Sequence, residues 1–212
     1  LCGDGKVLLL ISKTGNFGYY DPATEPVFEN EHGELSFKYN IGCTPVHMHE
    51  YIPIKDIKKR LARTDPKFPF QYLRVVFKEH IKNAQCRRYG FNPSHIQSFV
   101  YYASTRGCLT NVHYDETASF LYQYEGRKRV ILIESQYSHL LQNEHCQGSC
   151  ARRSSLFHSK IPDHVLETIP HKKMILHPGT TLFISPFVWH EIESLDTPTI
   201  SGVLSFKEPF QE

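Results

Sequence analysis

The chain has 212 residues, of which 40% are hydrophobic, 22% charged and 13% aromatic, and its formal net charge is +2. These values are ordinary for a globular protein and argue against a disordered chain or a strongly basic nucleic-acid-binding one. No apolar run approaches the roughly 20 residues that a membrane-spanning helix needs, so we expect no membrane partner. The length favours one large domain, and we expect a single domain over residues 1–212.

The six cysteines are scattered along the chain without a C-x-x-C pair. This spacing fits neither a dense disulfide framework nor a zinc ribbon, so we expect an intracellular protein, cytoplasmic or nuclear. His145, Cys146 and Cys150 leave a small zinc site open, although no fourth ligand is evident. The chain begins at Leu1 rather than Met, and we expect that targeting segments are missing from it.

Residues 1–94 predict a flanking region of mixed structure. Val7 to Ile11 are typical of a buried strand, and a second strand is expected near 71–77. Between them, Pro53 opens a short amphipathic helix that places Ile54, Ile57 and Leu61 on one face.

Residues 95–206 predict a closely spaced series of strands, which are rich in β-branched and aromatic residues and separated by Gly, Pro, Asn and Asp. The eight expected strands are 96–103, 111–115, 119–124, 129–134, 173–177, 181–185, 190–195 and 199–206. Such a series favours a mainly β fold, a double-stranded β-helix (jelly roll, cupin-like) with a few flanking helices. An insertion at 135–172 interrupts the series, and an insertion of that length favours a functional lid or an interaction element.

One set of residues in these strands suits a metal ion. His113 and Asp115 alternate within an expected strand and would therefore point to one face, and His190 begins a later strand. Two imidazoles and one carboxylate leave adjacent positions open on the metal, which is typical of non-haem Fe(II) oxygenases. The same His-x-acid pattern at His32 and Glu34 lies next to Gly33, in an expected turn, and has no such context.

The segments around these ligands resemble a known family. The stretches 110–116 (TNVHYDE), 123–132 (QYEGRKRVIL) and 176–194 (LHPGTTLFISPFVWHEIES) are similar to the JmjC-domain, cupin-like 2-oxoglutarate oxygenases. Among these, the chain looks most like the asparaginyl hydroxylase of the hypoxia-inducible factor and the tRNA wybutosine hydroxylase. The resemblance is clear over residues 95–206 and is not visible in the first 50.

The resemblance implies an Fe(II) site at His113, Asp115 and His190, with 2-oxoglutarate as cosubstrate and O2 as oxidant. Lys128 matches the lysine that pairs with the distal carboxylate of 2-oxoglutarate, and a buried cation is what such a carboxylate needs. Two hydroxyl groups match further contacts to that carboxylate, those of Thr110 and Tyr72. Three positions depart from the pattern. Serine stands at Ser119 and Ser205 where the family often has Asn near the cosubstrate, and Thr180 replaces a frequent Asp after Pro-Gly.

The implied activity is a dioxygenase that hydroxylates a protein side chain, or an RNA nucleoside, and releases succinate and CO2. Three alternatives remain open: an N-methyl-lysine demethylase of the JmjC type, an inactive member that binds a partner, and a cupin metalloenzyme without 2-oxoglutarate. A protein substrate is the expected partner. A homodimer is possible because homodimers are common among relatives, but the sequence shows no element that would form one, so the oligomeric state stays undecided. Five aromatic residues are candidates to line the cavity: Tyr101, Tyr102, Tyr122, Tyr124 and Trp189.

Overall fold

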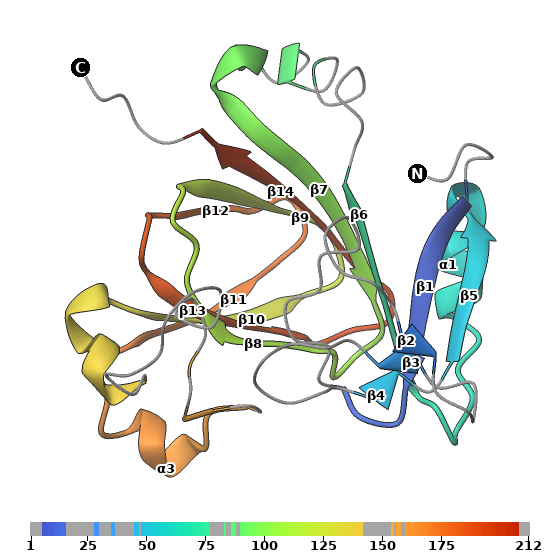
Figure 1. Ribbon diagram of the computed structural model, residues 1–212, viewed down its shortest axis with the longest axis horizontal. Helices are drawn as coiled ribbons and strands as arrows, with labels where there is room; N and C mark the ends of the chain where they lie inside the picture. The colour runs from blue at the N-terminus through green and yellow to red at the C-terminus, as the bar shows by residue number, and fades with distance from the viewer. Residues whose placement is uncertain are drawn as a thin grey trace.

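The computed structural model describes residues 6–15, 28–29, 35–36, 45–46, 48–76, 83, 86–87, 90–141, 154, 156–157 and 160–207. Within these residues, antiparallel strands form two large sheets and one small one (Figure 1). This is the cupin-like, jelly-roll arrangement that the strand pattern predicted. None of the helices in the described ranges is long and apolar enough to span a membrane.

The larger sheet has seven strands in the order β12-β9-β14-β7-β6-β1-β5. Its core strands carry alternating side chains, so one face points toward the second sheet and the other points away. The bounds are β1 Lys6–Ser12, β5 Met48–Pro53, β6 Phe70–Val76, β7 Ile96–Ser104, β9 Ser119–Glu125, β12 Thr181–Ile184 and β14 Thr199–Phe206.

The smaller of the two large sheets has four strands in the order β11-β10-β13-β8. Its bounds are β8 Leu109–His113, β10 Lys128–Ile133, β11 Lys172–Leu176 and β13 Trp189–Ser194. All eight strands expected between residues 95 and 206 are therefore present, and their ends lie within two residues of the predicted ones. A separate three-stranded sheet consists of β2 Phe28–Glu29, β3 Leu35–Ser36 and β4 Pro45–Val46.

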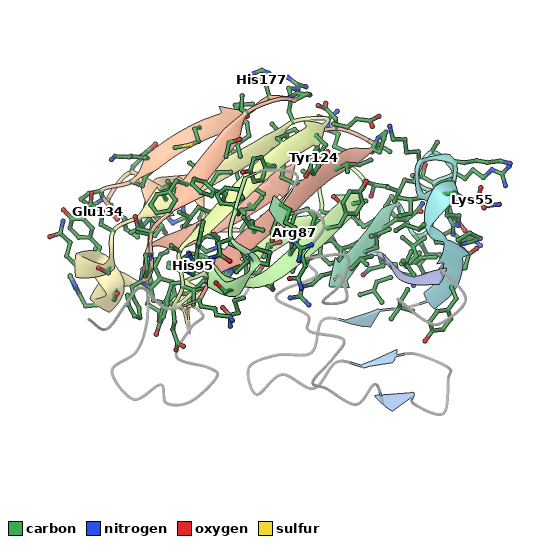
Figure 2. All side chains as sticks on the ribbon, turned by 90° about the horizontal axis from the view of Figure 1, so that it is seen from above. Lys55, Arg87, His95, Tyr124, Glu134 and His177 are labelled. Atoms are coloured by element: carbon green, nitrogen blue, oxygen red, sulfur yellow. The ribbon has the colours of Figure 1, made fainter. Side chains whose placement is uncertain are left out.

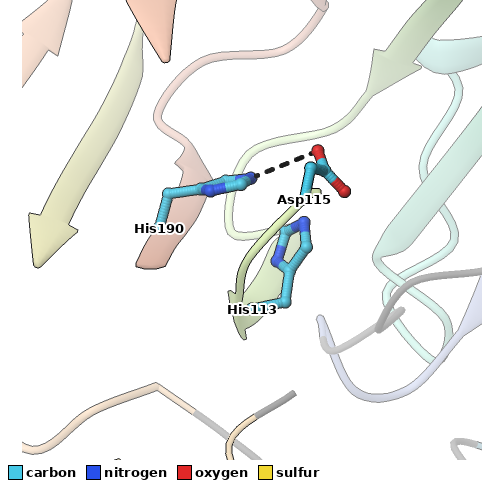
Figure 3. A group of neighbouring side chains, drawn as sticks. All are labelled: His113, Asp115 and His190. Carbon is cyan, nitrogen blue, oxygen red and sulfur yellow. Dashed lines mark ion pairs between the residues drawn. The ribbon is translucent and has the colours of Figure 1, made fainter. Parts of the chain in front are cut away.

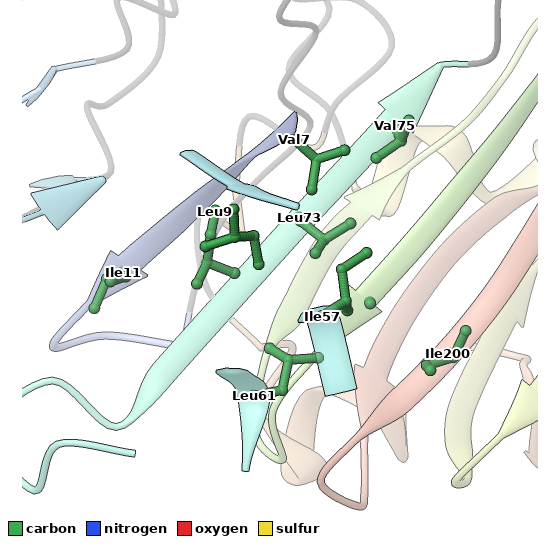
Figure 4. Packing of buried hydrophobic residues seen from close by; sticks show 10 residues of the cluster. Val7, Leu9, Ile11, Ile57, Leu61, Leu73, Val75 and Ile200 are labelled. Carbon is green, nitrogen blue, oxygen red and sulfur yellow. The ribbon is translucent and has the colours of Figure 1, made fainter. Parts of the chain in front are cut away.

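A short helical stretch covers the outer face of the seven-stranded sheet (Figure 4). The 3-10 turn η1 Ile54–Asp56 leads into α1 Ile57–Leu61, as the apolar spacing predicted. Ile57 and Leu61 are buried against Leu73 of β6, whereas Ile54 is 38% exposed and does not join this core. Because Leu73 points outward to α1, its neighbours on β6 point inward between the two sheets.

The described part of the insertion covers the outer face of the four-stranded sheet. It contains the 3-10 segment η3 Ser135–Leu140 and the helix α3 Asp163–Leu166, and a further 3-10 turn, η2 Pro93–His95, precedes β7. The core beneath the insertion consists of Val112, Ile131, Ile133, Leu141, Ile161, Leu166, Ile169 and Trp189. Part of each outer face is therefore covered by helical segments, and the inner faces of the two sheets are turned toward each other.

Candidate metal centre

His113 and His190 meet across two neighbouring strands. His113 is the last residue of β8 and His190 the second of β13, and the antiparallel register places them directly opposite each other. Their ring centroids lie 4.1 Å apart, and both residues are buried, with 6% and 3% exposure (Figure 3). Opposite residues on paired strands project to the same face, so both imidazoles point into the space between the sheets.

Asp115 reaches the same place from a loop. The prediction that Asp115 belongs to the strand of His113 is wrong, because β8 ends at His113. A distant segment fixes the loop instead: the backbone N–H of Phe187 donates to the carbonyl oxygen of Asp115 at 2.8 Å. Phe187 has a φ of 62°, an uncommon left-handed conformation for a bulky residue, and it turns the chain into β13. The side chain of Asp115 is half-buried, so the carboxylate lies on the more open side of the two rings.

The three side chains form a group that could hold one metal ion. Their potential ligand atoms all lie within 4.8 Å of one another, and Nε2 of His190 is 3.9 Å from Oδ2 of Asp115. Each imidazole makes its second contact through Nδ1, to a backbone carbonyl two residues earlier: His113 to Asn111 at 2.7 Å and His190 to Val188 at 3.0 Å. A carbonyl oxygen can only accept, so Nδ1 carries the proton and Nε2 keeps its lone pair for a metal. The donor set of two imidazoles and one carboxylate fits a divalent iron-type ion.

One pocket between the sheets joins this group to most of the other predicted site residues. Lys128, Thr110, Tyr72 and Ser119 line it together with the three candidate ligands. Ser205 pairs in register with Ser119 across β14 and β9 but is not among the lining residues. The roles of these residues remain predictions, and their arrangement puts a basic group and several hydroxyls beside a potential metal site.

Lys128 is a buried cation at one end of this pocket. It is 7% exposed, its Nζ donates to Oγ of Ser201 at 2.6 Å, and Nζ lies 5.6 Å from the centroid of the Tyr102 ring. Burial lowers the pKa of Lys128 to about 8. Burial also raises the pKa of the Cys108 thiol to about 12, so this thiol stays protonated. Among the residues that the structure describes, no carboxylate pairs with Lys128.

Sequence reasoning missed several polar residues of this region, including Arg74 and Ser201. Arg74 lines the pocket, and its Nε donates to the hydroxyl of Tyr102 at 3.3 Å. Arg74 follows Tyr72 by two residues on β6, so strand alternation alone would have indicated it. Ser201 has no comparable local signal, because its partner Lys128 lies on a strand of the other sheet.

Among the five aromatic candidates for the cavity, only Tyr102 lines the pocket. The prediction is wrong for Tyr101 and Tyr122, which pack against clusters on the outer face of the seven-stranded sheet, and for Tyr124, which is 41% exposed. It is also wrong for Trp189, which is fully buried beneath the insertion. Each of these side chains follows its strand's alternation to the face away from the pocket.

Two further predictions fall on residues outside the described ranges. These are the zinc site at His145, Cys146 and Cys150 and the comparison pair His32 and Glu34. Cys86 and Cys108, which are described, are buried free thiols.

Comparisons with known proteins give the same fold. JmjC domain-containing protein D of Dictyostelium discoideum is 31% identical over 94 residues, which cover 42% of this chain and 21% of that protein. The X-ray structure of E. coli ycfD matches with a TM-score of 0.51 and 19% identity, over 97% of this chain and 43% of that one. A structure of YcfD, described as a ribosomal oxygenase from Escherichia coli in complex with cobalt and 2-oxoglutarate, has a TM-score of 0.48 and 18% identity, over 98% and 41% of the two chains.

The present chain thus spans about one fifth of the curated relative and about two fifths of the solved structures. At these identities the likeness to ycfD shows a shared fold. A family model described as "Cupin-like domain" matches residues 48–212, which is well over half of the sequence. The chain therefore belongs to the cupin-like domain family.

Proposed function

We propose that this chain is an Fe(II)- and 2-oxoglutarate-dependent dioxygenase that hydroxylates a protein side chain and releases succinate and CO2. The observation that carries the proposal is one pocket lined both by the His113, Asp115 and His190 group and by the buried cation of Lys128. A metal site alone would suit many cupin-fold enzymes. A buried cation beside it favours a cosubstrate that carries a carboxylate at its far end.

In this proposal His113, Asp115 and His190 hold the iron. Bound there, the iron supplies the oxidising chemistry with 2-oxoglutarate and O2. The protein's contribution is positional: the two carbonyl contacts at Nδ1 fix the ring orientations, and the N–H of Phe187 fixes the backbone of Asp115. The half-buried carboxylate leaves the open side of the group toward solvent and substrate.

Lys128 would bind the distal carboxylate of 2-oxoglutarate. Ser201 holds its Nζ in place, and the Tyr102 ring lies against the same cation. Thr110 and Tyr72 offer hydroxyl donors in the same pocket. Ser119 reaches less far than an Asn would at this position, so we expect it to contact the cosubstrate less directly.

A protein substrate is favoured over RNA by the charge of the chain. The whole chain carries a net charge of only +2. Nucleic-acid affinity depends on several basic groups that neutralise phosphates. Hydroxylation and N-demethylation begin with the same oxidation, so the product decides between them.

The test is an anaerobic titration of the protein with Fe(II) and then with 2-oxoglutarate. We expect the weak visible absorption band that a 2-oxo acid gives when it chelates Fe(II). Metal binding without this band would contradict the use of 2-oxoglutarate, and the absence of metal binding would favour an inactive partner-binding protein. Mass spectrometry of candidate peptides and RNAs then identifies the product, because hydroxylation adds one oxygen and demethylation removes a methylene.

A further inference from the structure

The side chains of β13 alternate between two faces, one toward the pocket and one toward the insertion. His190, Ile192 and Ser194 line the pocket. The alternate residues Trp189 and Glu191 point to the opposite face, where both are almost fully buried, at 0% and 1% exposure. The two residues that flank His190 in sequence therefore lie under the insertion.

Glu191 is a buried carboxylate with two specific partners. Its Oε2 accepts from the backbone N–H of Ile161, in the insertion, at 2.8 Å. Its Oε1 accepts from Nη2 of Arg129, on β10, at 2.9 Å. Trp189 adds a third hydrogen bond from β13, because its Nε1 donates to Oγ of Ser138, in the insertion, at 2.8 Å. The proposed catalytic pocket uses none of these contacts.

Glu191 also lies where the strand ladder is interrupted. In the register between β13 and β8, His190 pairs with His113 and Ile192 pairs with Thr110. Two residues of β8 therefore stand opposite Glu191 alone, which is the pattern of a β-bulge. A bulge weakens this ladder locally and can redirect side chains next to an active site. On its other side β13 keeps an unbroken ladder with β10, where Glu191 pairs with Ile131, and the side chain of Glu191 adds its contact to the insertion.

We propose that Glu191 is a positioning residue for His190, and that it acts by fastening β13, opposite the bulge of β8, to the insertion. The inference rests on the proposed metal site. Residues around a metal that do not bind it still tune its affinity when they fix the orientation of a ligand. Here the fixed element is the backbone on the C-terminal side of His190. The segment at Ile161 then acts as a support behind the metal strand.

The experiment measures Co(II) binding, as a spectroscopic substitute for Fe(II), by titration of the d–d absorption band in the wild type, Glu191→Ala and Glu191→Gln. Removing an outer partner of a ligand typically lowers metal affinity about 10- to 100-fold, and we expect a loss of about tenfold in Glu191→Ala with a shifted band. Glu191→Gln keeps an oxygen for the Ile161 N–H and should lose less. Hydrogen exchange of the amides in 160–171 should be faster in Glu191→Ala.

Two controls separate positioning from general destabilisation. Glu193→Gln makes the same chemical change two residues further on, where Glu193 also pairs with Arg129 but is more exposed. It should bind Co(II) within about twofold of the wild type. Leu61→Ala removes a buried side chain of α1 that packs against the seven-stranded sheet, and should lower the melting temperature without a shift of the cobalt band.

Wild-type Co(II) affinity and band position in both Glu191 variants would overturn the inference, even if either variant melts earlier. If Glu191→Ala does not fold, Glu191→Gln compared with Glu193→Gln decides the matter. A wild type that binds no Co(II) would overturn the proposed function itself, and with it this inference.

Discussion

His190 lies directly opposite His113, with the two ring centroids 4.1 Å apart and each Nδ1 in contact with the backbone carbonyl two residues earlier. Neither ring can turn without losing that contact, so the pair presents two prepared Nε2 atoms to one point. The pairing of β8 with β13 therefore sets the positions of the two histidine ligands.

His113→Ala and His190→Ala should each abolish specific metal binding. Loss of a ligand removes more than loss of an outer partner, so we expect the affinity for Co(II) to fall by more than about 100-fold. Isothermal titration calorimetry measures this directly. His177→Ala is the matched control, because His177 is an exposed histidine at the periphery of the molecule (Figure 2). Equal losses in His177→Ala and His190→Ala would contradict the assignment.

Lys128→Met should separate cosubstrate binding from stability. Hydrogen bonds to charged groups contribute about 1.5–3 kcal/mol, so affinity for 2-oxoglutarate should fall at least about tenfold while Co(II) still binds. Folding should not suffer, because the substitution removes a buried charge that desolvation disfavours. Arg127→Met is the control, since Arg127 is an exposed neighbour paired with Asp196. The hypothesis fails if the two variants bind 2-oxoglutarate equally well.

The lowered pKa of Lys128 predicts a stability effect with a defined sign. The group takes up a proton more readily in the unfolded chain, with its ordinary pKa of 10.5, than in the folded protein, at about 8. Burial of the charged ammonium group therefore lowers the free energy of unfolding. This loss is at its full size below about pH 8 and declines as the pH rises toward 10.5. Between about pH 7 and pH 9.5 the wild type should gain about 2 kcal/mol relative to Lys128→Met. Urea unfolding at the two pH values measures this gain, and a constant difference would contradict it.

The same pKa predicts how cosubstrate binding depends on pH. A carboxylate beside Lys128 favours the charged form and raises its pKa. Above about pH 8, binding of 2-oxoglutarate should therefore take up a proton, and the affinity should decline. Calorimetry in buffers of different ionisation enthalpy counts the proton, and Lys128→Met should show no such uptake.

Gly126, in the turn that leads into Lys128, should tolerate no side chain. It has a φ of +68°, and a Cβ atom there would lie 2.5 Å from the carbonyl oxygen of Pro198. Gly179 has a similar φ of +85° but open space around it. Gly179→Ala should cost about 1–2 kcal/mol from the backbone conformation alone, and Gly126→Ala clearly more. Chemical unfolding measures both losses of unfolding free energy. Similar losses in Gly126→Ala and Gly179→Ala would contradict the predicted effect of the clash at Gly126.

Local patterns were sufficient for much of the fold. The eight core strands follow from alternating apolar residues and from the turn residues between them, and membership of the cupin-like family is confirmed. The helix after Pro53 is present as well, although Ile54 remains exposed because it lies in a 3-10 turn before α1.

The placement of Asp115 could not be predicted in the same way. The His-x-Asp spacing indicates alternation within one strand, but a hydrogen bond from Phe187, far along the chain, holds Asp115 in a loop. The contact between Ser201 and Lys128 and the docking of the insertion on Trp189 are long-range in the same sense. Each depends on which strands become neighbours, and the local sequence does not contain that information.

The two histidines and Lys128 lie on β8, β13 and β10, which are consecutive strands of a single hydrogen-bonded sheet. Their mutual spacing is therefore set by one ladder and is independent of how the two sheets sit against each other. In the proposed reaction, the fixed distance between the two histidines and Lys128 selects dicarboxylates of one chain length. The facing seven-stranded sheet supplies Tyr72, Tyr102 and Ser201 around Lys128, so we expect only its positions away from these three residues to diverge for different substrates.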